Sequence, residues 1–207
     1  MYNKKPFIVF EGIEGSGKSY HSKNLTFELK RLKIPYLHLR EPGGTKFSEK
    51  IRKLILDNKN NKLNPLTDTL LYLAARNENF IKNIKPHYKK KIIICDRFID
   101  STIAYQSYGL KVDINLINKI NNSILGNIKP DFTFLLNISI SESLNRLSRR
   151  KKLNRYDKFK KNFYKNVQLG FLKLALKNKK KYLVLNSNKK IEQNKKIIIS
   201  KFFKLIK

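Results

Sequence analysis

A glycine-rich turn near the start of the chain constrains the fold more than any other feature. The residues that follow the apolar run Phe7–Phe10 fit the pattern G-x-x-x-x-G-K-[ST], and a segment with helical periodicity comes next. Glycines permit positive φ angles, so backbone N–H groups can close around phosphate oxygens, and a helix N-terminus adds its positive dipole end. This strand, turn and helix predict a phosphate-binding loop. Its residues are Gly12, Ile13, Glu14, Gly15, Ser16, Gly17, Lys18 and Ser19.

Four polar residues in and beyond this turn are suited to phosphoryl transfer. Lys18 is predicted to reach the β- and γ-phosphates of a bound nucleotide, and the Ser19 hydroxyl to ligate Mg²⁺. Asp96 ends an apolar run, where a carboxylate can orient Mg²⁺ or its waters, and Arg97 is suited to clamp a second phosphate. The alternative for these last two is a buried structural ion pair. We expect a site for ATP and Mg²⁺, with Ser19 and Asp96 as metal ligands.

The order of apolar segments predicts an α/β fold. Between the apolar runs lie longer segments with helical periodicity, so strands alternate with helices and form a parallel sheet that is covered on both faces. The pair Ser139 and Glu142 fits a capping box that opens a helix. The stretch 148–161 is basic and poor in apolar residues, and we expect a short lid there within a single domain, 1–207. The predicted strands are Phe7–Phe10, Tyr36–Leu39, Ile92–Cys95, Phe132–Leu136 and Tyr182–Leu185.

The amino-acid composition limits the cellular compartment and the binding partners that we expect for this protein. Lys and Arg number 46 against 15 Asp and Glu, a formal charge of +31, but the lysines are spread along the chain among Asn and Ile. We attribute this to A/T-biased composition of a solvated surface rather than to a specific polyanion partner, although such a field attracts phosphates. One cysteine excludes an internal disulfide. With no signal-peptide pattern and no apolar run near 20 residues, we expect a cytoplasmic protein without a membrane segment.

Four stretches together resemble the bacterial-type thymidylate kinases, which are P-loop nucleoside monophosphate kinases. The resemblance implies a three-layer α/β P-loop NTPase fold, with a five-stranded parallel sheet flanked by helices. It also implies a homodimer and the reaction ATP + dTMP → ADP + dTDP with Mg²⁺. The phosphate loop is generic, whereas the other three stretches together are specific to the family. The matching residues are Phe10–Ser19, Arg40–Thr45, Ala74–Arg76 and Asp96–Gln106.

The resemblance also assigns the contacts to dTMP. Tyr72 is expected to stack on thymine, with Arg76 one helical turn away as donor to a base carbonyl. Arg52 is expected to join Arg97 on the acceptor phosphate. Without the family, Tyr72 would be interpreted as a core residue. The remaining expected contacts are Pro42, Thr102 and Gln106 around the base, with Glu14 and Tyr105 around the sugar.

The resemblance implies that the lid supplies the cation that stabilises the transferred phosphoryl group. Some members of the family carry a basic residue at a variable position of the phosphate loop, and this chain has none there. The lid offers Arg149, Arg150 and Arg155. Arg155 matches the arginine of the family's Asp-Arg-x-Glu, which appears here as Asn-Arg-Tyr-Asp, so Arg155 is predicted to be catalytic. Asn186-Ser187 stands where the family commonly has Asp-Ala, which leaves the adenine pocket undefined.

Four other functions are alternatives to this interpretation. A nucleoside monophosphate kinase with different or relaxed base choice stays possible from sequence alone. A nucleic-acid-binding protein would need basic residues clustered with aromatic residues in a groove, and the lysines here are dispersed. An inactive nucleotide-binding remnant is disfavoured because Lys18, Ser19, Asp96 and Arg97 are intact. A GTP-binding protein is disfavoured because the segment that begins at Asn188 reads N-K-K-I, without the carboxylate that binds guanine.

Overall fold

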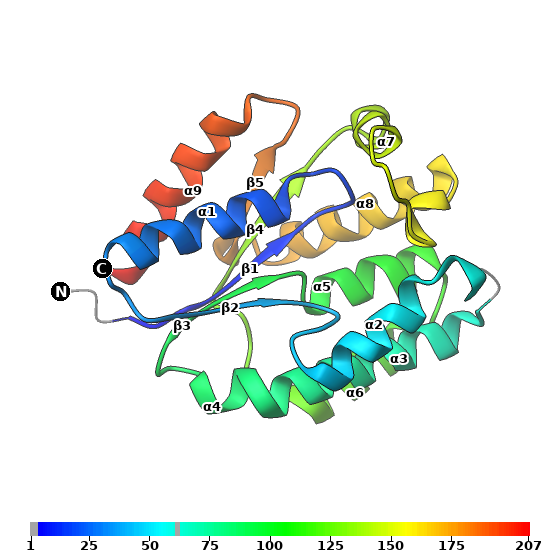
Figure 1. The fold of residues 1–207 in the computed structure, drawn as a ribbon, viewed down its shortest axis with the longest axis horizontal. Coiled ribbons are helices and arrows are strands. Elements are labelled where there is room, and N and C mark those ends of the chain that lie inside the picture. The colour runs from blue at the N-terminus through cyan, green and yellow to red at the C-terminus, as the bar shows by residue number, and fades with distance from the viewer. Residues whose placement is uncertain (1–3, 61–62) are drawn as a thin grey trace.

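The computed structural model describes residues 4–60 and 63–207. It contains one parallel five-stranded sheet with the order β2-β3-β1-β4-β5, which confirms the predicted architecture (Figure 1). All five predicted strands are present, and each extends one residue beyond the predicted end. The added residue is polar in every strand, because the apolar runs stop where the buried sheet meets the site. The strands are β1 (Phe7–Glu11), β2 (Tyr36–Arg40), β3 (Ile92–Asp96), β4 (Phe132–Asn137) and β5 (Tyr182–Asn186).

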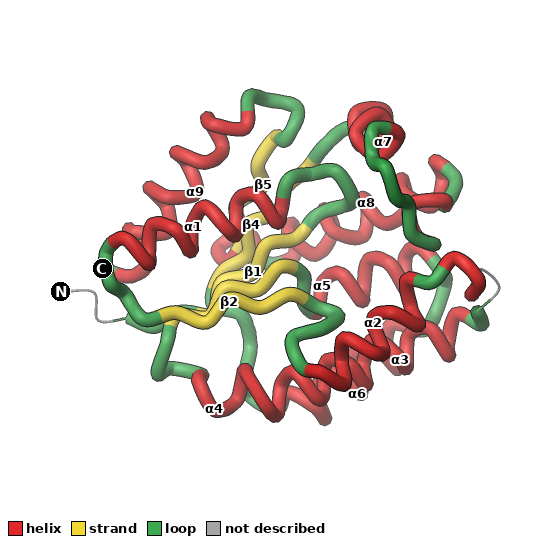
Figure 2. Tube along the Cα trace, viewed as in Figure 1, coloured by secondary structure: helices red, strands yellow, loops and turns green. Residues whose placement is uncertain are grey.

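Helices cover both faces of the sheet, as Figure 2 shows. A π-helical turn over Phe80–Ile84 joins α3 to α4, and a second one over Ile103–Gly109 continues α5. The helices are α1 (Lys18–Arg31), α2 (Lys46–Leu56), α3 (Pro65–Asn79), α4 (Lys85–His87), α5 (Ile99–Thr102), α6 (Ile114–Leu125), α7 (Ile140–Ser148), α8 (Lys161–Lys177) and α9 (Ile191–Ile206). Short 3₁₀ turns occupy Asn58–Asn60, Tyr156–Lys158 and Lys179–Lys181.

Alternation along β1 divides the core into two layers. Ile8 and Phe10 point to the face covered by α1 and α9, where they join Phe202. Phe7 and Val9 point to the other face, against the helices that follow β2 and β3. Successive side chains of a strand lie on opposite faces, so a continuous apolar run serves both layers at once. A further cluster of buried apolar side chains lies around α2, α3 and α8, beyond the carboxyl edge of the sheet.

Helix starts follow local sequence signals. The Ser139 hydroxyl accepts a hydrogen bond from the Glu142 backbone N–H at 3.3 Å, as the capping box predicted. The reciprocal bond is absent from the described contacts, because the Glu142 carboxylate binds Arg146 at 2.7 Å. Asn64 caps α3 and is followed by Pro65, whose ring fits the first helical turn.

The predicted lid, 148–161, joins α7 to α8. Residues 149–152 are exposed, whereas Arg155, Tyr156 and Asp157 are buried. The lid segment is therefore attached to the body of the domain at its centre. In the part of the chain that the structure describes, no helix has both the length and the apolarity needed to cross a membrane.

We expect Phe134→Ala to lower the free energy of unfolding by about 3–5 kcal/mol, because it leaves a cavity in the sheet core. Phe134 is 0% exposed and its ring stacks on Phe10 with 5.2 Å between centroids. Phe27→Ala is the matched control, since Phe27 is 64% exposed on α1, and it should cost less than about 0.5 kcal/mol. Urea denaturation of both variants measures the difference, and equal losses would contradict this account of the core.

Candidate active site

The phosphate-binding loop connects β1 to α1 at the carboxyl edge of the sheet. Gly12, Gly15 and Gly17 have positive φ angles, as the glycine spacing predicted. Gly12 shows why no side chain fits, since a Cβ there would lie 2.4 Å from the Leu136 carbonyl oxygen. Lys18 is buried under the loop and its Nζ donates to the Ile13 carbonyl at 2.8 Å. Burial, together with the nearby charge of Arg97, lowers the pKa of Lys18 to about 7.

Ser19 and Asp96 meet at the start of α1. The Ser19 hydroxyl donates to the Asp96 carboxylate. Their proximity follows from the register of the sheet, in which Phe10 of β1 is the partner of Asp96 on β3. Two oxygen donors beside a phosphate loop fit Mg²⁺, which takes one or two protein ligands and completes its shell with phosphate and water. No larger cluster of metal-binding side chains occurs within residues 4–60 and 63–207.

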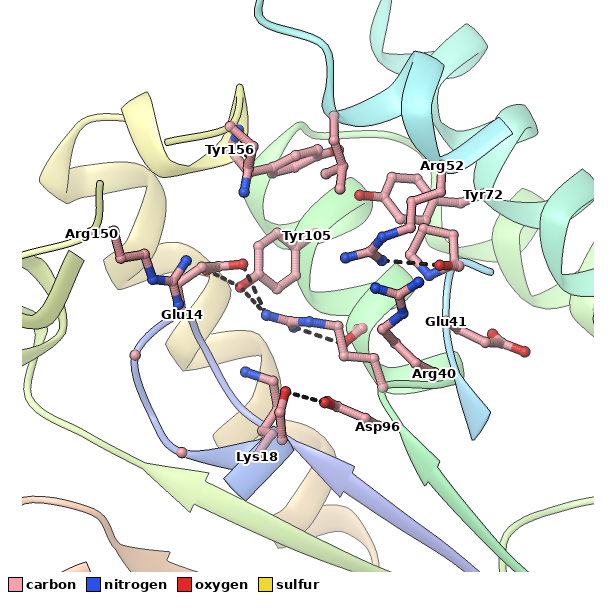
Figure 3. Close-up of a pocket in the computed structure, with 18 of the residues that line it drawn as sticks. Glu14, Lys18, Arg40, Glu41, Arg52, Tyr72, Asp96, Tyr105, Arg150 and Tyr156 are labelled. Carbon is pink, nitrogen blue, oxygen red and sulfur yellow. Dashed lines mark hydrogen bonds and ion pairs between the residues drawn. The ribbon is translucent and has the colours of Figure 1, made fainter. Parts of the chain in front are cut away.

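Arg97 connects the end of β3 to the phosphate loop. Its guanidinium donates to the Glu14 carboxylate at 2.9 Å, to the Gly12 carbonyl at 3.0 Å and to the Ser101 hydroxyl at 3.0 Å. Tyr105 donates to the same Glu14 carboxylate, and Arg97 lies 5.0 Å from the centroid of the Tyr105 ring. Three predicted site residues, Glu14, Arg97 and Tyr105, therefore form one cluster, in which Figure 3 labels Glu14 and Tyr105.

Glu11 supports this cluster from below, and the sequence motifs predicted no role for it. Its carboxylate accepts from the Phe98 and Ser101 backbone N–H groups at 2.8 and 3.2 Å, and from the Ser101 hydroxyl at 2.6 Å. Because Ser101 in turn accepts from Arg97, Glu11 fixes the turn that carries Arg97, whose φ is 71°. Burial raises the pKa of Glu11 to about 7, and the Asp100 carboxylate adds to this effect.

Glu14, Lys18, Ser19 and Arg97 line a pocket of about 350 Å³ above the sheet edge. The loop and Asp96 form one side, and α2, α3 and β2 form the other. Arg52 lies on the second side, where it donates to the Pro42 carbonyl at 2.9 Å, next to a cis Glu41–Pro42 peptide bond. The predicted site residues that line the pocket are Glu14, Gly15, Gly17, Lys18, Ser19, Pro42, Arg52, Tyr72, Asp96, Arg97, Tyr105 and Gln106.

Gly12, Ile13 and Ser16 belong to the loop but are not among the lining residues, and the structure also places Arg76 and Thr102 behind the pocket wall. Arg76 is 2% exposed, and it binds Glu41 at 2.8 Å and Asn121 at 2.7 Å. Its charge is therefore balanced inside the protein. The Thr102 hydroxyl is buried and has no partner among the described residues.

Arg155, the predicted catalytic arginine, does not line the pocket in this structure. It is buried, forms an ion pair with Asp68 of α3, and donates from Nε to the Ile55 carbonyl at 3.0 Å. Arg150 lines the pocket instead, and its Nη1 lies 3.3 Å from the Asp157 carboxylate. The sequence motif could not show this, because Asp68 is 87 residues away from Arg155.

Sequence reasoning assigned no role to three further residues of the site. Arg40 ends β2 and lines the pocket, bound to Glu49 at 2.7 Å. Tyr156 of the lid lines it from above. Arg146 of α7 braces the phosphate loop through the Gly15 carbonyl at 3.0 Å. The position of Arg40 at the polar end of a strand could have indicated a site residue. The positions of Tyr156 and Arg146 follow only from tertiary packing.

The site thus brings cations to both sides of one pocket. Lys18 and the loop N–H groups lie on one side, and Arg40 and Arg52 lie on the other (Figure 3). Arg97 also lines the pocket and donates to Gly12 and Glu14 of the loop. Such an arrangement is chemically suited to two phosphorylated molecules whose phosphates face each other, the geometry that direct phosphoryl transfer requires.

Comparison with known proteins identifies the family. A model of the thymidylate kinase family matches residues 10–198. Thymidylate kinase of Mycoplasma capricolum subsp. capricolum is 42% identical over 190 residues, which cover 90% of this chain and 89% of the relative. Thymidylate kinase of Ehrlichia canis is 40% identical, with coverage of 89% and 90%.

A solved structure agrees with the sequence comparisons. The crystal structure of thymidylate kinase from Ehrlichia chaffeensis superposes with a TM-score of 0.77 at 35% identity, and the match covers 95% of this chain and 97% of that one. Fold, site and sequence therefore lead to one conclusion: the chain belongs to the thymidylate kinase family.

Proposed function

We propose that this chain transfers the γ-phosphoryl group of ATP to dTMP and so forms ADP and dTDP. The observation that carries the proposal is the pocket with cations on both sides, in a chain of the thymidylate kinase family. An oxygen of the dTMP phosphate attacks the γ-phosphorus, and the bond to the β-phosphate oxygen of ATP breaks. No covalent enzyme intermediate is needed, because positioning and charge stabilisation supply the catalysis.

We assign the residue roles from their positions. Lys18 binds the β- and γ-phosphates, while Arg97 and Arg52 bind the acceptor phosphate. Ser19 and Asp96 would hold Mg²⁺, which neutralises charge on the ATP phosphates when it is bound. Glu14 and Tyr105 are proposed to contact the sugar from the wall of the pocket.

The base is proposed to lie between side chains of three segments. Tyr72 of α3 and Pro42 after β2 would pack against its faces, and Gln106 would meet its edge, because all three line the pocket. The positions of Arg76 and Thr102 behind this wall support an indirect role for both residues in this conformation.

Arg150 is the lid residue that we propose as the cation at the transferred phosphoryl group, in place of Arg155. Arg150 lines the pocket and its side chain is 43% exposed, whereas Arg155 is used in the buried pair with Asp68. A cation that meets the charge developing in the transition state raises kcat without tightening substrate binding.

We also propose that the protein assembles as a homodimer through α2 and α3. These helices lie side by side (Figure 1) and expose large apolar side chains, which supports a contact surface there. Sedimentation should give about twice the 24.4 kDa of one chain, and a mass of 24.4 kDa would contradict the proposal. The exposed residues are Phe47, Leu54, Leu66 and Leu70.

In an ADP-release assay, dTMP should be a better acceptor than dUMP, UMP, CMP or AMP.

Arg52→Ala should raise the KM for dTMP by about 10–100-fold and leave the KM for ATP unchanged, since a charge-assisted bond is worth about 1.5–3 kcal/mol. Lys53→Ala is the matched control, because Lys53 is the next cation on α2 but does not line the pocket.

Two outcomes would contradict these assignments. Faster turnover of another monophosphate would show that base choice differs from the proposal. A rise in the KM for ATP in Arg52→Ala, with the KM for dTMP unchanged, would place Arg52 on the donor instead.

Arg150→Ala should lower kcat by about 10²–10³ and change either KM only a few-fold. Arg149→Ala is the matched control, since Arg149 carries the same charge one residue earlier and does not line the pocket. Arg155→Ala should instead lower the melting temperature, because it leaves Asp68 without its partner in the interior. Steady-state kinetics and thermal melting measure both effects. Loss of kcat in Arg155→Ala without any change in melting temperature would restore Arg155 as the catalytic cation.

A further inference from the structure

Asp68 of α3 is a buried carboxylate between the lid and the base side of the pocket. It is 0% exposed. Oδ1 pairs with Arg155, and Oδ2 accepts from the Tyr156 hydroxyl and from the Gln106 amide nitrogen, the latter at 3.3 Å. One carboxylate therefore joins the lid to a residue that lines the pocket.

The network fixes the orientation of the Gln106 amide. Nε2 lies 2.9 Å from the Tyr156 hydroxyl oxygen and 3.3 Å from Asp68 Oδ2. An ionised carboxylate only accepts hydrogen bonds, so the amide must present its NH₂ group to Asp68. Both amide hydrogens then have acceptors. The carbonyl Oε1 is the group left to meet a ligand in the pocket that Gln106 lines.

A hydrogen-bond acceptor at this position discriminates between pyrimidines. Thymine and uracil carry an N–H group at N3, which donates to a carbonyl oxygen. Cytosine has an unprotonated N3, whose lone pair would face that oxygen without a bond. A site built around a hydrogen bond rejects the analogue that cannot form it, because a buried polar group is left unpaired.

We infer that Asp68 is a positioning residue for base selection, which orients the Gln106 amide so that its carbonyl oxygen accepts from the N3–H of an imide base. The inference rests on the proposed function, with the acceptor nucleotide in this pocket. Asp68 acts together with Tyr156, which supplies the second acceptor for the amide hydrogens. Because Tyr156 belongs to the lid, the orientation is complete only when that segment is in place.

Arg155 has a defined part in this network. A carboxylate at 0% exposure requires a compensating charge, and Arg155 supplies it while its guanidinium lies 4.8 Å from the centroid of the Tyr156 ring. The arginine of the lid motif thus holds Asp68 and Tyr156 together and does not need to reach the phosphates.

Tyr156→Phe tests the inference, with Tyr164→Phe as its matched control. Both variants lose one buried tyrosine hydroxyl that bonds within the same region. The Tyr164 hydroxyl donates to the Tyr156 carbonyl at 2.8 Å and does not contact Asp68 or Gln106. The readout is the inhibition constant of dCMP against dTMP, divided by the KM for dTMP, in the full-length enzyme.

The expected result is a fall in this ratio of about 3–10-fold in Tyr156→Phe and no change in Tyr164→Phe. A double variant, Asp68→Asn with Arg155→Gln, removes both charges together, so that no buried charge is left unpaired. In that variant the amide is free to turn, and the ratio should fall by about tenfold or more, while the KM for ATP stays within a few-fold of the wild-type value.

Two results would overturn the inference. A ratio that stays within twofold of wild type in folded Tyr156→Phe would show that the network is only structural. An equal fall in Tyr164→Phe would show that loosening of the lid segment, rather than the amide orientation, sets selectivity. Wild-type turnover of dTMP in the same assay tests the proposed function separately, so either failure can be recognised.

Discussion

The placement of Arg97 is the constraint on which the site depends. Its backbone N–H donates to the Phe10 carbonyl at 3.0 Å, and its side chain reaches the Gly12 carbonyl on the phosphate loop. Both contacts exist because β1 and β3 are adjacent parallel strands that end at the same edge. The left-handed backbone of Arg97 is then held by Glu11 through Phe98 and Ser101. The pairing of these two strands therefore brings Arg97 next to the phosphate-binding loop.

Carboxylates balance part of the positive charge of the pocket. Arg97 is paired with Glu14, and Arg40 is paired with Glu49. Lys18 has only the Ile13 carbonyl and the Ser16 hydroxyl as hydrogen-bond partners among the described residues, and burial lowers its pKa. On the proposed roles, a bound phosphate would replace existing acceptors at the arginines and would compensate the charge of the lysine. The overall charge of +31 favours the approach of such anions.

The sequence predicted what depends on local pattern. Apolar runs located all five strands, and the glycine spacing located the loop, because backbone geometry and burial act within a few residues. The sequence could not locate side chains whose position depends on a distant partner. Arg76 and Arg155 belong to recognisable motifs, yet each is held in the interior by an acid, Glu41 and Asp68, that lies 35 and 87 residues away. Only the tertiary fold shows which arginines keep a side chain free for the pocket.

The buried pair of Asp68 and Arg155 is difficult to explain by stability alone. Taking both charges out of water costs several kcal/mol per ion, and this cost can exceed the free energy of their attraction. Two apolar side chains of similar volume would pack there at least as well. A carboxylate at this position can instead do what apolar atoms cannot, because it accepts hydrogen bonds in fixed directions from Tyr156 and Gln106. The pair is therefore better explained by the orientation that it imposes on the pocket wall, and the lid arginine by the ion pair that it forms with that buried carboxylate.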